Sequence, residues 1–294
     1  MSYESGVKIM NKKIAIQGFR ASFHEIAANK FFGKEIAVVM CETFKEVFNS
    51  LERQEVNFGV VAIENTVAGS ILPNYALLRD YNVNIIGEVY LRIQQNLMAL
   101  PNQKIEELTE VRSHQMALLQ CQDFFETYYP NIKLAESTDT ALSAKEIREK
   151  NLKGIGAIAS LEAAEAFDLE VLAESIETNK RNYTRFLIIK ENEDINENNC
   201  SKILNDKANK ASICFNLSHK SGSLANILIS FASLDINLTK IQSLPVLGRE
   251  WEYFFHLDLE FNDYFIYKKA LEIVNKTVNE LTVLGEYLVG EKYL

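Results

Sequence analysis

A cluster of polar residues at the end of an apolar run carries the first candidate chemistry. Glu64, Asn65 and Thr66 follow residues 58–63, a short apolar run that predicts a buried strand. In open α/β sheets, ligands bind at the carboxyl ends of strands. These three side chains are therefore candidate site residues. The alternative is a polar loop that is capped by Asn65 and turned by Gly69.

A second polar segment, residues 181–186, precedes the apolar run 187–189. It holds two arginines, an asparagine and a threonine within six residues. Because guanidinium groups pair strongly with carboxylates and phosphates, the segment indicates an anion-binding surface with the Thr184 hydroxyl inside it. Taken alone, the same pattern is consistent with the solvated start of a strand.

Ser113 and His114 precede a predicted helix over residues 115–121. Ser113 can cap this helix, and Gln120 lies two turns further on, near the same face. A Ser/His pair suggests nucleophilic catalysis, but adjacent residues seldom point at one another and no acid is placed to orient the histidine. We therefore expect a capping serine and a half-buried histidine rather than a hydrolase.

The loop over residues 18–24 follows the first predicted strand and contains Ser22. A loop that leads into a helix N-terminus offers backbone N–H groups and a positive dipole end, which suit an anion. The alternative is that Ser22 simply caps the helix. The sequence has no H-E-x-x-H, Walker or G-x-G-x-x-G motif, so it predicts neither a metal nor a dinucleotide site. His219 and His256 are isolated and are expected to be structural.

The elements that must position these residues alternate between strands and helices up to residue 190. Core stripes at helical spacing are expected at Phe44, Val47, Phe48 and Leu51 and at His114, Leu118, Cys121 and Phe125. Strands are expected over 12–16, 36–41, 58–63 and 154–159. This alternation predicts βαβ units and a mostly parallel sheet. The extended run 83–100 is expected to pass between two α/β lobes with a cleft.

A composition break at residues 191–210 divides the chain. Six of its twenty residues are asparagine, so we interpret it as an exposed linker between domains 12–190 and 211–294, with residues 1–11 as a leader outside the fold. Residues 211–294 have the order βαββαβ of a ferredoxin-like layout. The expected elements are a strand over 212–217, a helix opened by Gly222 and Ser223, strands over 236–247 and 251–260 with Gly248 in the turn, a helical face of Tyr267, Leu271, Val274, Val278 and Leu281, and a strand over 283–289.

Composition excludes several classes of protein. The formal net charge is −9, which argues against a nucleic-acid binder. No stretch approaches the roughly 18 consecutive apolar residues of a membrane span, and the first residues do not form a secretory signal. Four widely spaced cysteines, with no CxxC pair, indicate reduced thiols in a cytoplasmic protein.

Several of these motifs, in this order, resemble the prephenate dehydratase family. They are residues 62–66 with Gly69, Ser113-His114 with Gln120-Cys121, and residues 182–186. Residues 222–224 and 236–241 resemble the family's regulatory ACT domain. Two positions depart from the family's pattern. Gln115 and Met116 stand where the family has Pro-Gln, and Gln242 and Leu244 stand in the effector loop where it has Glu and Arg.

The resemblance implies a two-lobed, periplasmic-binding-protein-like catalytic unit that converts prephenate to phenylpyruvate by decarboxylative dehydration, with no metal or organic cofactor. Thr184 would hydrogen-bond or protonate the leaving hydroxyl, polarised by the other catalytic candidates, Glu64, Asn65, Ser113 and Gln120. The implied substrate-binding residues are Arg185, Thr66, Ser22, His114, Asn182 and Phe186. Chemistry suggests that Arg185 holds the pyruvyl carboxylate, because a firmly paired ring carboxylate would resist decarboxylation.

The ACT resemblance implies feedback regulation by L-phenylalanine and a homodimer or homotetramer. Its effector-binding candidates are Gly222, Ser223, Leu224, Ala225, Asn237, Gln242 and Ser243, and the changes in the effector loop leave the identity of the effector open. The alternative function is a non-catalytic two-lobed protein that binds or senses an aromatic acid. We expect no chorismate mutase activity, because eleven leader residues cannot hold the extra helical segment that it requires.

Overall fold

The computed structural model describes residues 12–192, 207–217, 220–246 and 252–293. The expected leader, most of the expected linker, His219, Gly248 and Trp251 therefore lie outside the described residues. The chain forms two compact units. One contains Met1–Ser70, Tyr90–Phe186 and Lys292–Leu294, and the other contains Ile71–Val89 and Leu187–Glu291.

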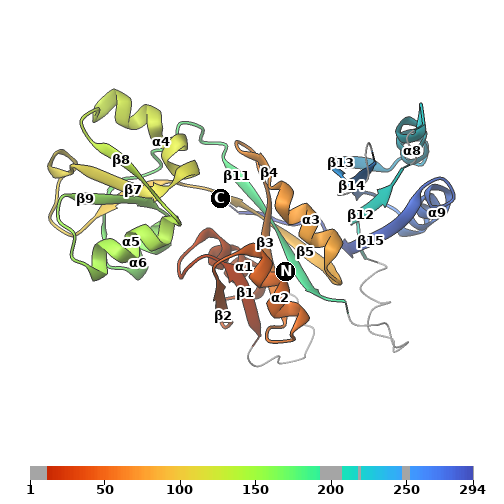
Figure 1. The fold of residues 1–294 in the computed structure, drawn as a ribbon, viewed down its shortest axis with the longest axis horizontal. Helices are drawn as coiled ribbons and strands as arrows, with labels where there is room; N and C mark the ends of the chain where they lie inside the picture. The colour runs from red at the N-terminus through yellow and green to blue at the C-terminus, as the bar shows by residue number, and fades with distance from the viewer. Residues whose placement is uncertain (1–11, 193–206, 218–219, 247–251, 294) are drawn as a thin grey trace. The chain divides into compact units, whose positions relative to one another are not determined.

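The first sheet has the strand order β16-β5-β11-β3-β1-β2, with β4 paired to β3 (Figure 1). Strand β1 is parallel to both β2 and β3, as the βαβ pattern predicts. The strands are β1 (Lys13–Gln17), β2 (Ala37–Cys41), β3 (Phe58–Asn65), β4 (Gly69–Ser70), β5 (Val83–Arg92), β11 (Tyr183–Glu191) and β16 (Lys292–Tyr293). The accompanying helices are α1 (Phe23–Phe32), α2 (Phe44–Glu52) and α3 (Leu72–Asp80).

Local sequence explains where these helices begin. Thr43 and Glu46 form a capping box at α2, and the predicted stripe of Val47, Phe48 and Leu51 is buried. Ser22 caps α1, as one of the two interpretations of its loop predicted, and accepts a hydrogen bond from the N–H of Glu25.

The second sheet has the order β10-β6-β9-β7-β8. Strands β7, β8 and β9 are parallel to one another, whereas β6 pairs antiparallel with both β9 and the edge strand β10. Its strands are β6 (Asn96–Ala99), β7 (Glu110–His114), β8 (Lys133–Ser137), β9 (Ile155–Ala159) and β10 (Glu170–Ala173), and its helices are η1 (Ile105–Glu107), α4 (Gln115–Tyr128), α5 (Thr140–Glu149) and α6 (Leu161–Ala166). The run 83–100 supplies β5 to the first sheet and β6 to the second, which confirms the predicted crossing.

The N-cap of α4 differs from the prediction. His114, not Ser113, is the N-cap, and its ring nitrogen accepts a hydrogen bond from the N–H of Met116. Ser113 is the penultimate residue of β7 and is fully buried. Helix α4 begins at Gln115, as predicted, so His114 precedes it, is exposed and is not part of the core stripe that Leu118, Cys121 and Phe125 form.

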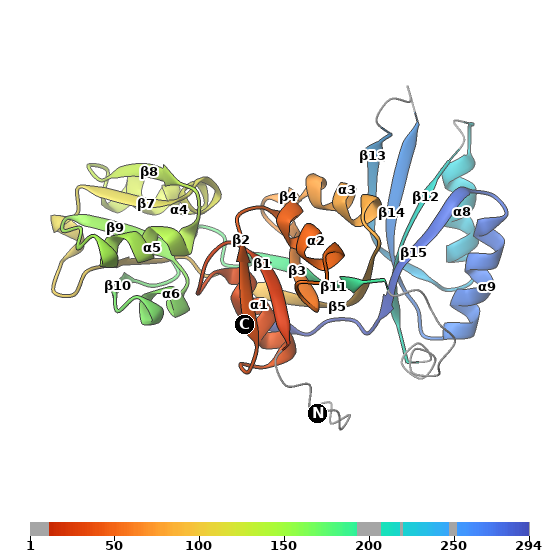
Figure 2. The same ribbon diagram turned by 60° about the horizontal axis from the view of Figure 1, so that its bottom comes forward.

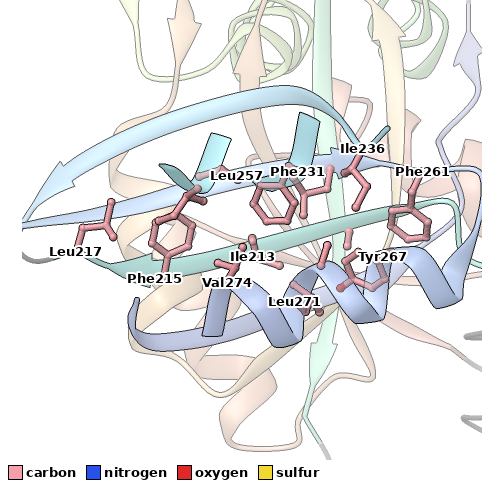
Figure 3. Close-up of a cluster of buried hydrophobic side chains, with 14 residues drawn as sticks. Ile213, Phe215, Leu217, Phe231, Ile236, Leu257, Phe261, Tyr267, Leu271 and Val274 are labelled. Carbon is pink, nitrogen blue, oxygen red and sulfur yellow. The ribbon is translucent and has the colours of Figure 1, made fainter. Parts of the chain in front are cut away.

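The third sheet has the order β13-β14-β12-β15 and confirms the ferredoxin-like layout. Figures 1 and 2 show α8 and α9 on one face of this sheet. The elements are β12 (Lys210–Asn216), α8 (Ser223–Ala232), β13 (Asn237–Pro245), β14 (Tyr253–Glu260), α9 (Tyr264–Asn275) and β15 (Asn279–Tyr287). Alternate residues Ile213 and Phe215 of β12 pack against α9 and Phe231 of α8 (Figure 3).

Two predicted boundaries in this region are wrong. Helix α9 ends at Asn275, so Val278 and Leu281 do not continue its buried face. The last long strand begins at Asn279 rather than at residue 283, and it ends at Tyr287. Both apolar residues still pack on the same core, which is why their spacing resembled a helical stripe.

The second compact unit contains a close contact between β5 and β15. A Cβ on Gly285 would lie 2.1 Å from the carbonyl oxygen of Ile85, and a Cβ on Gly290 would lie 2.3 Å from that of Glu88. Only glycine permits this approach of the two backbones. The carboxylate of Glu88 accepts hydrogen bonds from the Gly290 N–H and from the Lys210 ammonium, each at 3.0 Å.

Helix α3 packs on the third sheet in the same unit. The Tyr75 ring meets the His256 ring edge-on at 5.3 Å between centroids, and the Arg79 guanidinium lies 4.6 Å from the centroid of Phe254. His256 and Asp258 are consequently buried, although they alternate with the apolar residues of β14. His256 is structural, as predicted. No helix in the described part of the chain is long and apolar enough to cross a membrane.

Candidate functional site

Asn65, at the end of β3, joins three polar groups in the first compact unit. Its amide nitrogen Nδ2 donates hydrogen bonds to Oδ1 of Asn182 at 2.7 Å and to Oγ1 of Thr184 at 2.9 Å. Its carbonyl oxygen Oδ1 accepts from the backbone N–H groups of Val67 and Ala68. Because a backbone N–H can only donate, these two bonds fix the orientation of the Asn65 amide.

Thr66 connects the end of β3 to residues 181–183, next to the contacts of Asn65. Its N–H donates to the carbonyl of Tyr183, its hydroxyl donates to the carbonyl of Arg181, and the N–H of Tyr183 donates back to the hydroxyl. The side chain of Thr66 is therefore occupied by the backbone of residues 181–183, and its predicted contact with substrate stays a prediction.

Gln120 extends the network to α4, a helix that accompanies the second sheet. Its Oε1 accepts hydrogen bonds from Nδ2 of Asn182 at 2.9 Å and from Nε2 of Gln95 at 3.3 Å. No described residue accepts a hydrogen bond from Nε2 of Gln120. The amide nitrogen of this half-buried side chain is therefore available to an acceptor on a ligand.

Thr184 is 8% exposed, so its hydroxyl lies almost out of water. Its oxygen accepts from Asn65, and no described residue accepts its own hydrogen. A hydroxyl in this arrangement can donate to a ligand oxygen, and the Asn65 N–H favours negative charge that develops on the threonine oxygen. The polar segment 181–186 is thus not a solvated strand start, since β11 begins at Tyr183 and Asn182, Thr184 and Arg185 are buried.

Arg185 and Phe186 have different surroundings. Arg185 follows Thr184 on a strand, so the two side chains face opposite sides of the sheet. Its guanidinium lies 6.0 Å from the centroid of Tyr90. Phe186 shares the side of Thr184 and packs edge-on against the buried ring of His24 at 5.0 Å. Burial lowers the pKa of His24 to about 3.

Glu64 is half-buried and pairs with Ser70 across β3 and β4. By the same alternation, it faces the side of the sheet opposite to Asn65. The structure therefore brings Asn65, Asn182, Thr184 and Gln120 into one network, whereas Glu64 and Arg185 face the other side. The catalytic role of Glu64 and the carboxylate-binding role of Arg185 stay predictions.

The loop before α1 contacts the second sheet's elements. The Ser160 hydroxyl donates to the carbonyl of Ala21 at 3.0 Å, and a Cβ on Gly18 would lie 3.0 Å from Oδ2 of Asp139. Asp139 caps α5 through the N–H of Leu142, and burial raises the pKa of this carboxyl group. An acidic group thus lies beside the loop that was predicted to bind an anion.

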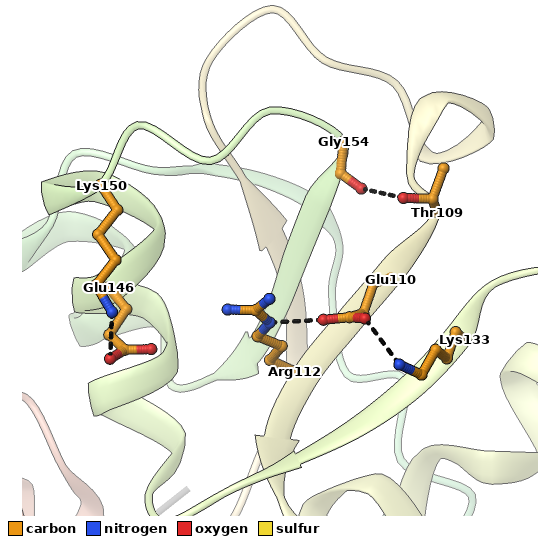
Figure 4. Close-up of polar contacts among 7 residues, drawn as sticks. All are labelled: Thr109, Glu110, Arg112, Lys133, Glu146, Lys150 and Gly154. Carbon is orange, nitrogen blue, oxygen red and sulfur yellow. Dashed lines mark hydrogen bonds and ion pairs between the residues drawn. The ribbon is translucent and has the colours of Figure 1, made fainter.

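The side-chain hydrogen bonds of Ser113 and His114 do not reach the network. The Ser113 hydroxyl donates to the carbonyl of Ile158 at 2.7 Å, inside the second sheet. Nearby on β7, Glu110 accepts from Arg112 at 2.7 Å and from Lys133 at 3.2 Å (Figure 4). These hydrogen bonds lower the pKa of Glu110.

The effector candidates lie on α8 and β13. Gly222 is the N-cap of α8 in a left-handed conformation with φ +80°, and the helix opens at Ser223 as predicted. Leu224 packs on the core, and Ala225 and Asn237 are exposed. The Gln242 amide donates to the carbonyl of Ser243 at 2.9 Å. Effector binding by these residues stays a prediction.

Sequence reasoning missed Gln95, Glu177 and Asp139. Gln95 lies in the apolar run 83–100, where a buried polar residue is itself a signal that was passed over. Asp139 before Thr140 and the apolar residues that follow has the pattern of a helix N-cap. Nothing in the residues around Glu177 distinguishes it from a surface glutamate.

The fold and site define a two-lobed, periplasmic-binding-protein-like α/β protein with a buried amide and hydroxyl network, followed by a ferredoxin-like region. A model of the family "Prephenate dehydratase" matches residues 14–194. This chain belongs to the prephenate dehydratase family.

Individual proteins that this chain resembles belong to the same family. A bifunctional chorismate mutase/prephenate dehydratase from Aquifex aeolicus is 33% identical over 94% of this chain and 73% of its own length. Arogenate dehydratase 2 from Petunia hybrida is 40% identical over 80% of this chain, which spans 57% of that protein. The solved prephenate dehydratase from Arthrobacter aurescens, in complex with L-Phe, is 26% identical with a TM-score of 0.83, over 96% of this chain and 91% of that one.

Proposed function

We propose that this protein converts prephenate to phenylpyruvate, as a carbon–oxygen lyase. Membership of the prephenate dehydratase family supports the reaction. The observation that carries the proposal is the hydrogen bond from Nδ2 of Asn65 to Oγ1 of Thr184, because it leaves the threonine hydrogen available to a leaving hydroxyl.

The reaction breaks two bonds and makes the ring aromatic. The electron pair of the bond to the ring carboxylate moves into the ring as carbon dioxide leaves. The bond to the ring hydroxyl breaks, and its oxygen leaves as water after taking a proton. Aromatisation supplies driving force from the substrate, so the protein's tasks are to hold the ring and to assist the departing oxygen.

In this proposal the Thr184 hydroxyl donates to the departing oxygen. A threonine is a very weak acid, so it requires a neighbour that stabilises charge on its oxygen, and Asn65 supplies that hydrogen bond. In the same proposal, the amide nitrogen of Gln120 binds a substrate oxygen. We also propose substrate contacts for Ser22 and His114. The carboxylate contact predicted for Arg185 is not part of this proposal, because its side chain faces the side of the sheet opposite to Thr184.

Arogenate is a second candidate substrate, because the Petunia relative at 40% identity is named an arogenate dehydratase. Arogenate carries an amino group where prephenate has a keto group, and the bonds broken at the ring are the same. Parallel assays with the two substrates at equal concentration decide between them by the ratio of kcat/KM.

The decisive experiment gives purified protein prephenate without added cofactor and follows phenylpyruvate. We expect turnover by the wild type and a loss of two or more orders of magnitude in Thr184→Ala, with unchanged circular dichroism. A wild type that binds prephenate but releases no product would identify the alternative, a binding or sensor protein. Product formation that is unaffected by Thr184→Ala would remove threonine from the mechanism.

We further propose that residues 211–294 form an ACT domain that pairs two chains and binds phenylalanine, in a cytoplasmic enzyme. The βαββαβ order supports the domain, and the L-Phe in the Arthrobacter structure supports the effector. Cys41, Cys121 and Cys214 are free, buried thiols, which supports the location. We expect phenylalanine to inhibit turnover and raise the melting temperature. Sedimentation with and without phenylalanine tests the proposed homodimer or homotetramer.

A further inference from the structure

A buried glutamine and a buried glutamate continue the network beyond the residues that the family motifs contain. Gln95 is 3% exposed and Glu177 is 1% exposed. Oε2 of Glu177 accepts a hydrogen bond from the backbone N–H of Gln95 at 2.9 Å. The Gln95 side chain in turn donates to Oε1 of Gln120. Glu177 is thus connected to Gln120 through a single intervening residue.

The segment around Glu177 also fixes the backbones of both glutamines. The N–H of Ile176 donates to the carbonyl of Gln95 at 2.7 Å, and the N–H of Thr178 donates to the carbonyl of Gln120 at 2.8 Å. Two backbone bonds therefore flank the Glu177 carboxylate. Together the three bonds hold Gln95 and Gln120 at a fixed separation.

Two backbone N–H groups determine which atom donates and which accepts in each hydrogen bond from Asn65 to Gln120. The Val67 and Ala68 N–H groups orient Asn65, so Oδ1 of Asn182 must accept and Nδ2 of Asn182 must donate. Oε1 of Gln120 must then accept, which turns its amide nitrogen out of the network. A second donor to the same oxygen, from Gln95, holds the Gln120 amide in that orientation.

The far end of the network is costly for stability. Among the described residues, Oε1 of Gln95 and Oε1 of Glu177 are buried without a hydrogen-bond partner. An unsatisfied buried acceptor is destabilising, and a buried carboxylate more so. Apolar side chains of similar size would avoid this penalty, so the two groups indicate a function other than stability.

We propose that Gln95 and Glu177 are positioning residues, which act through Gln120 by presenting its amide nitrogen to the substrate. The proposal rests on the function proposed above. Glu177 positions the Gln95 backbone through an acceptor oxygen, and Gln95 orients the Gln120 amide through its own amide nitrogen. Neither residue needs to touch the substrate.

Gln95→Met tests whether the Gln95 amide orients Gln120, because methionine keeps the length of the side chain and removes the hydrogen-bond donor. We expect kcat for prephenate to fall about tenfold with KM changed less than twofold. Gln94→Met is the matched control. The neighbouring Gln94 donates to Ser175 at 3.1 Å instead of joining the network, so this change should leave kcat unaltered. Equal kcat in Gln95→Met and wild type would overturn the proposal.

A double-mutant cycle tests whether Gln95 acts through Gln120. In a Gln120→Met background, Gln95→Met should change kcat by less than twofold, because the orientation that it maintains no longer matters. The same tenfold loss in both backgrounds would show that Gln95 acts elsewhere, and the proposal would be wrong.

Two substitutions of Glu177 test whether its acceptor oxygen or its negative charge is required. Glu177→Gln keeps an acceptor for the Gln95 N–H and should retain kcat within about threefold, whereas Glu177→Met should lose tenfold or more. If both lose activity equally while their melting temperatures match the wild type, the positioning role fails. A wild type that forms no phenylpyruvate instead refutes the proposed function, and this inference falls with it.

Discussion

Nδ2 of Asn65 donates a hydrogen bond to Oγ1 of Thr184 across 2.9 Å, although 119 positions separate the two residues. The bond places the end of β3 beside the start of β11. Because Asn65 is itself oriented by two backbone N–H groups, it can only donate to the threonine. The hydroxyl of Thr184 is therefore an acceptor toward the protein and a donor toward a ligand.

This pair predicts how conservative changes at the two positions differ. Thr184→Ser keeps the hydroxyl and should retain kcat within about tenfold, whereas Thr184→Val keeps the shape and should lose about 10²–10⁴, the usual contribution of a positioned proton donor. Asn65→Asp cannot donate to the threonine oxygen and should lose about 10². Steady-state kinetics with prephenate measures all three. A Thr184→Val enzyme as active as Thr184→Ser would contradict the role of the hydroxyl.

The buried ion pair between Lys210 and Glu88 predicts a large effect on stability. Lys210→Met leaves Glu88 charged and buried, so the free energy of unfolding should fall by about 3–5 kcal/mol. Adding Glu88→Gln should recover much of this loss, because the carboxylate that loses its ammonium partner is then only that of Glu260, whose side chain is 33% exposed. Urea unfolding measures both variants.

A surface pair supplies the control for this measurement. Lys150 contacts Glu146 at 2.8 Å one turn away on α5, and its side chain is 58% exposed. Lys150→Met should therefore change the free energy of unfolding by about 0–1 kcal/mol. Equal effects of Lys210→Met and Lys150→Met would show that burial adds nothing to the Glu88 pair.

The contact of β15 with β5 predicts that Gly285 tolerates no side chain. Gly285→Ala would place a methyl group 2.1 Å from the Ile85 carbonyl oxygen, so backbone must move and the loss should reach at least about 3 kcal/mol. Gly222→Ala is the comparison. Its Cβ would meet nothing within 4 Å, and its left-handed conformation with φ +80° should cost only about 1 kcal/mol. Thermal and urea unfolding of the two variants should rank them in this order.

Two buried histidines predict a loss of stability in mild acid. Burial lowers the pKa of His24 to about 3 and that of His256 to about 4, whereas an unfolded histidine titrates near 6.5. Between these values the unfolded chain binds more protons, so the free energy of unfolding falls on acidification. The expected loss is about 1.4 kcal/mol per pH unit for each histidine.

Single substitutions isolate each contribution to this pH dependence. His256→Phe keeps an aromatic ring against Tyr75. Between about pH 6.5 and pH 4 it should reduce the slope of the free energy of unfolding against pH by about 1.4 kcal/mol per pH unit, the contribution of one proton. His24→Phe should do the same beside Phe44 and Phe186. Urea unfolding at several pH values measures the slopes. An unchanged slope in His256→Phe would mean that this histidine is protonated in the folded protein.

The sequence predicted the strand that leads to Asn65, the run that supplies strands to both of the first two sheets, and the two residues at the centre of the network. Asn65 and Thr184 belong to recognisable motifs at the ends of apolar runs, and the ferredoxin-like order follows from alternating and helical spacing. The sequence did not predict which side of the sheet each of the neighbouring side chains faces. Glu64 and Arg185 are adjacent in sequence to Asn65 and Thr184, and only the strand assignment reveals that they face the other side.

The outer part of the network could not be predicted, because it depends on contacts between distant segments. Gln95 and Glu177 meet across 82 positions, and the local sequence of neither residue indicates a partner. The predicted cap of α4 was wrong for a different reason. Both Ser113 and His114 have side chains that can cap a helix, and Ser113 lies inside the strand β7, which ends at His114.

The second sheet and its helices are inserted into the first sheet between β5 and β11. The two ends of the insertion meet where the N–H of Ile93 donates to the carbonyl of Asn182 at 2.8 Å. Closing so long a loop in an unfolded chain carries an entropic penalty that grows with its length. Once the inserted lobe has folded, its ends are already close, and that penalty is largely removed. Folding of the inserted lobe thus brings Thr184 close to Asn65. Refolding should therefore restore activity only after the lobe has formed.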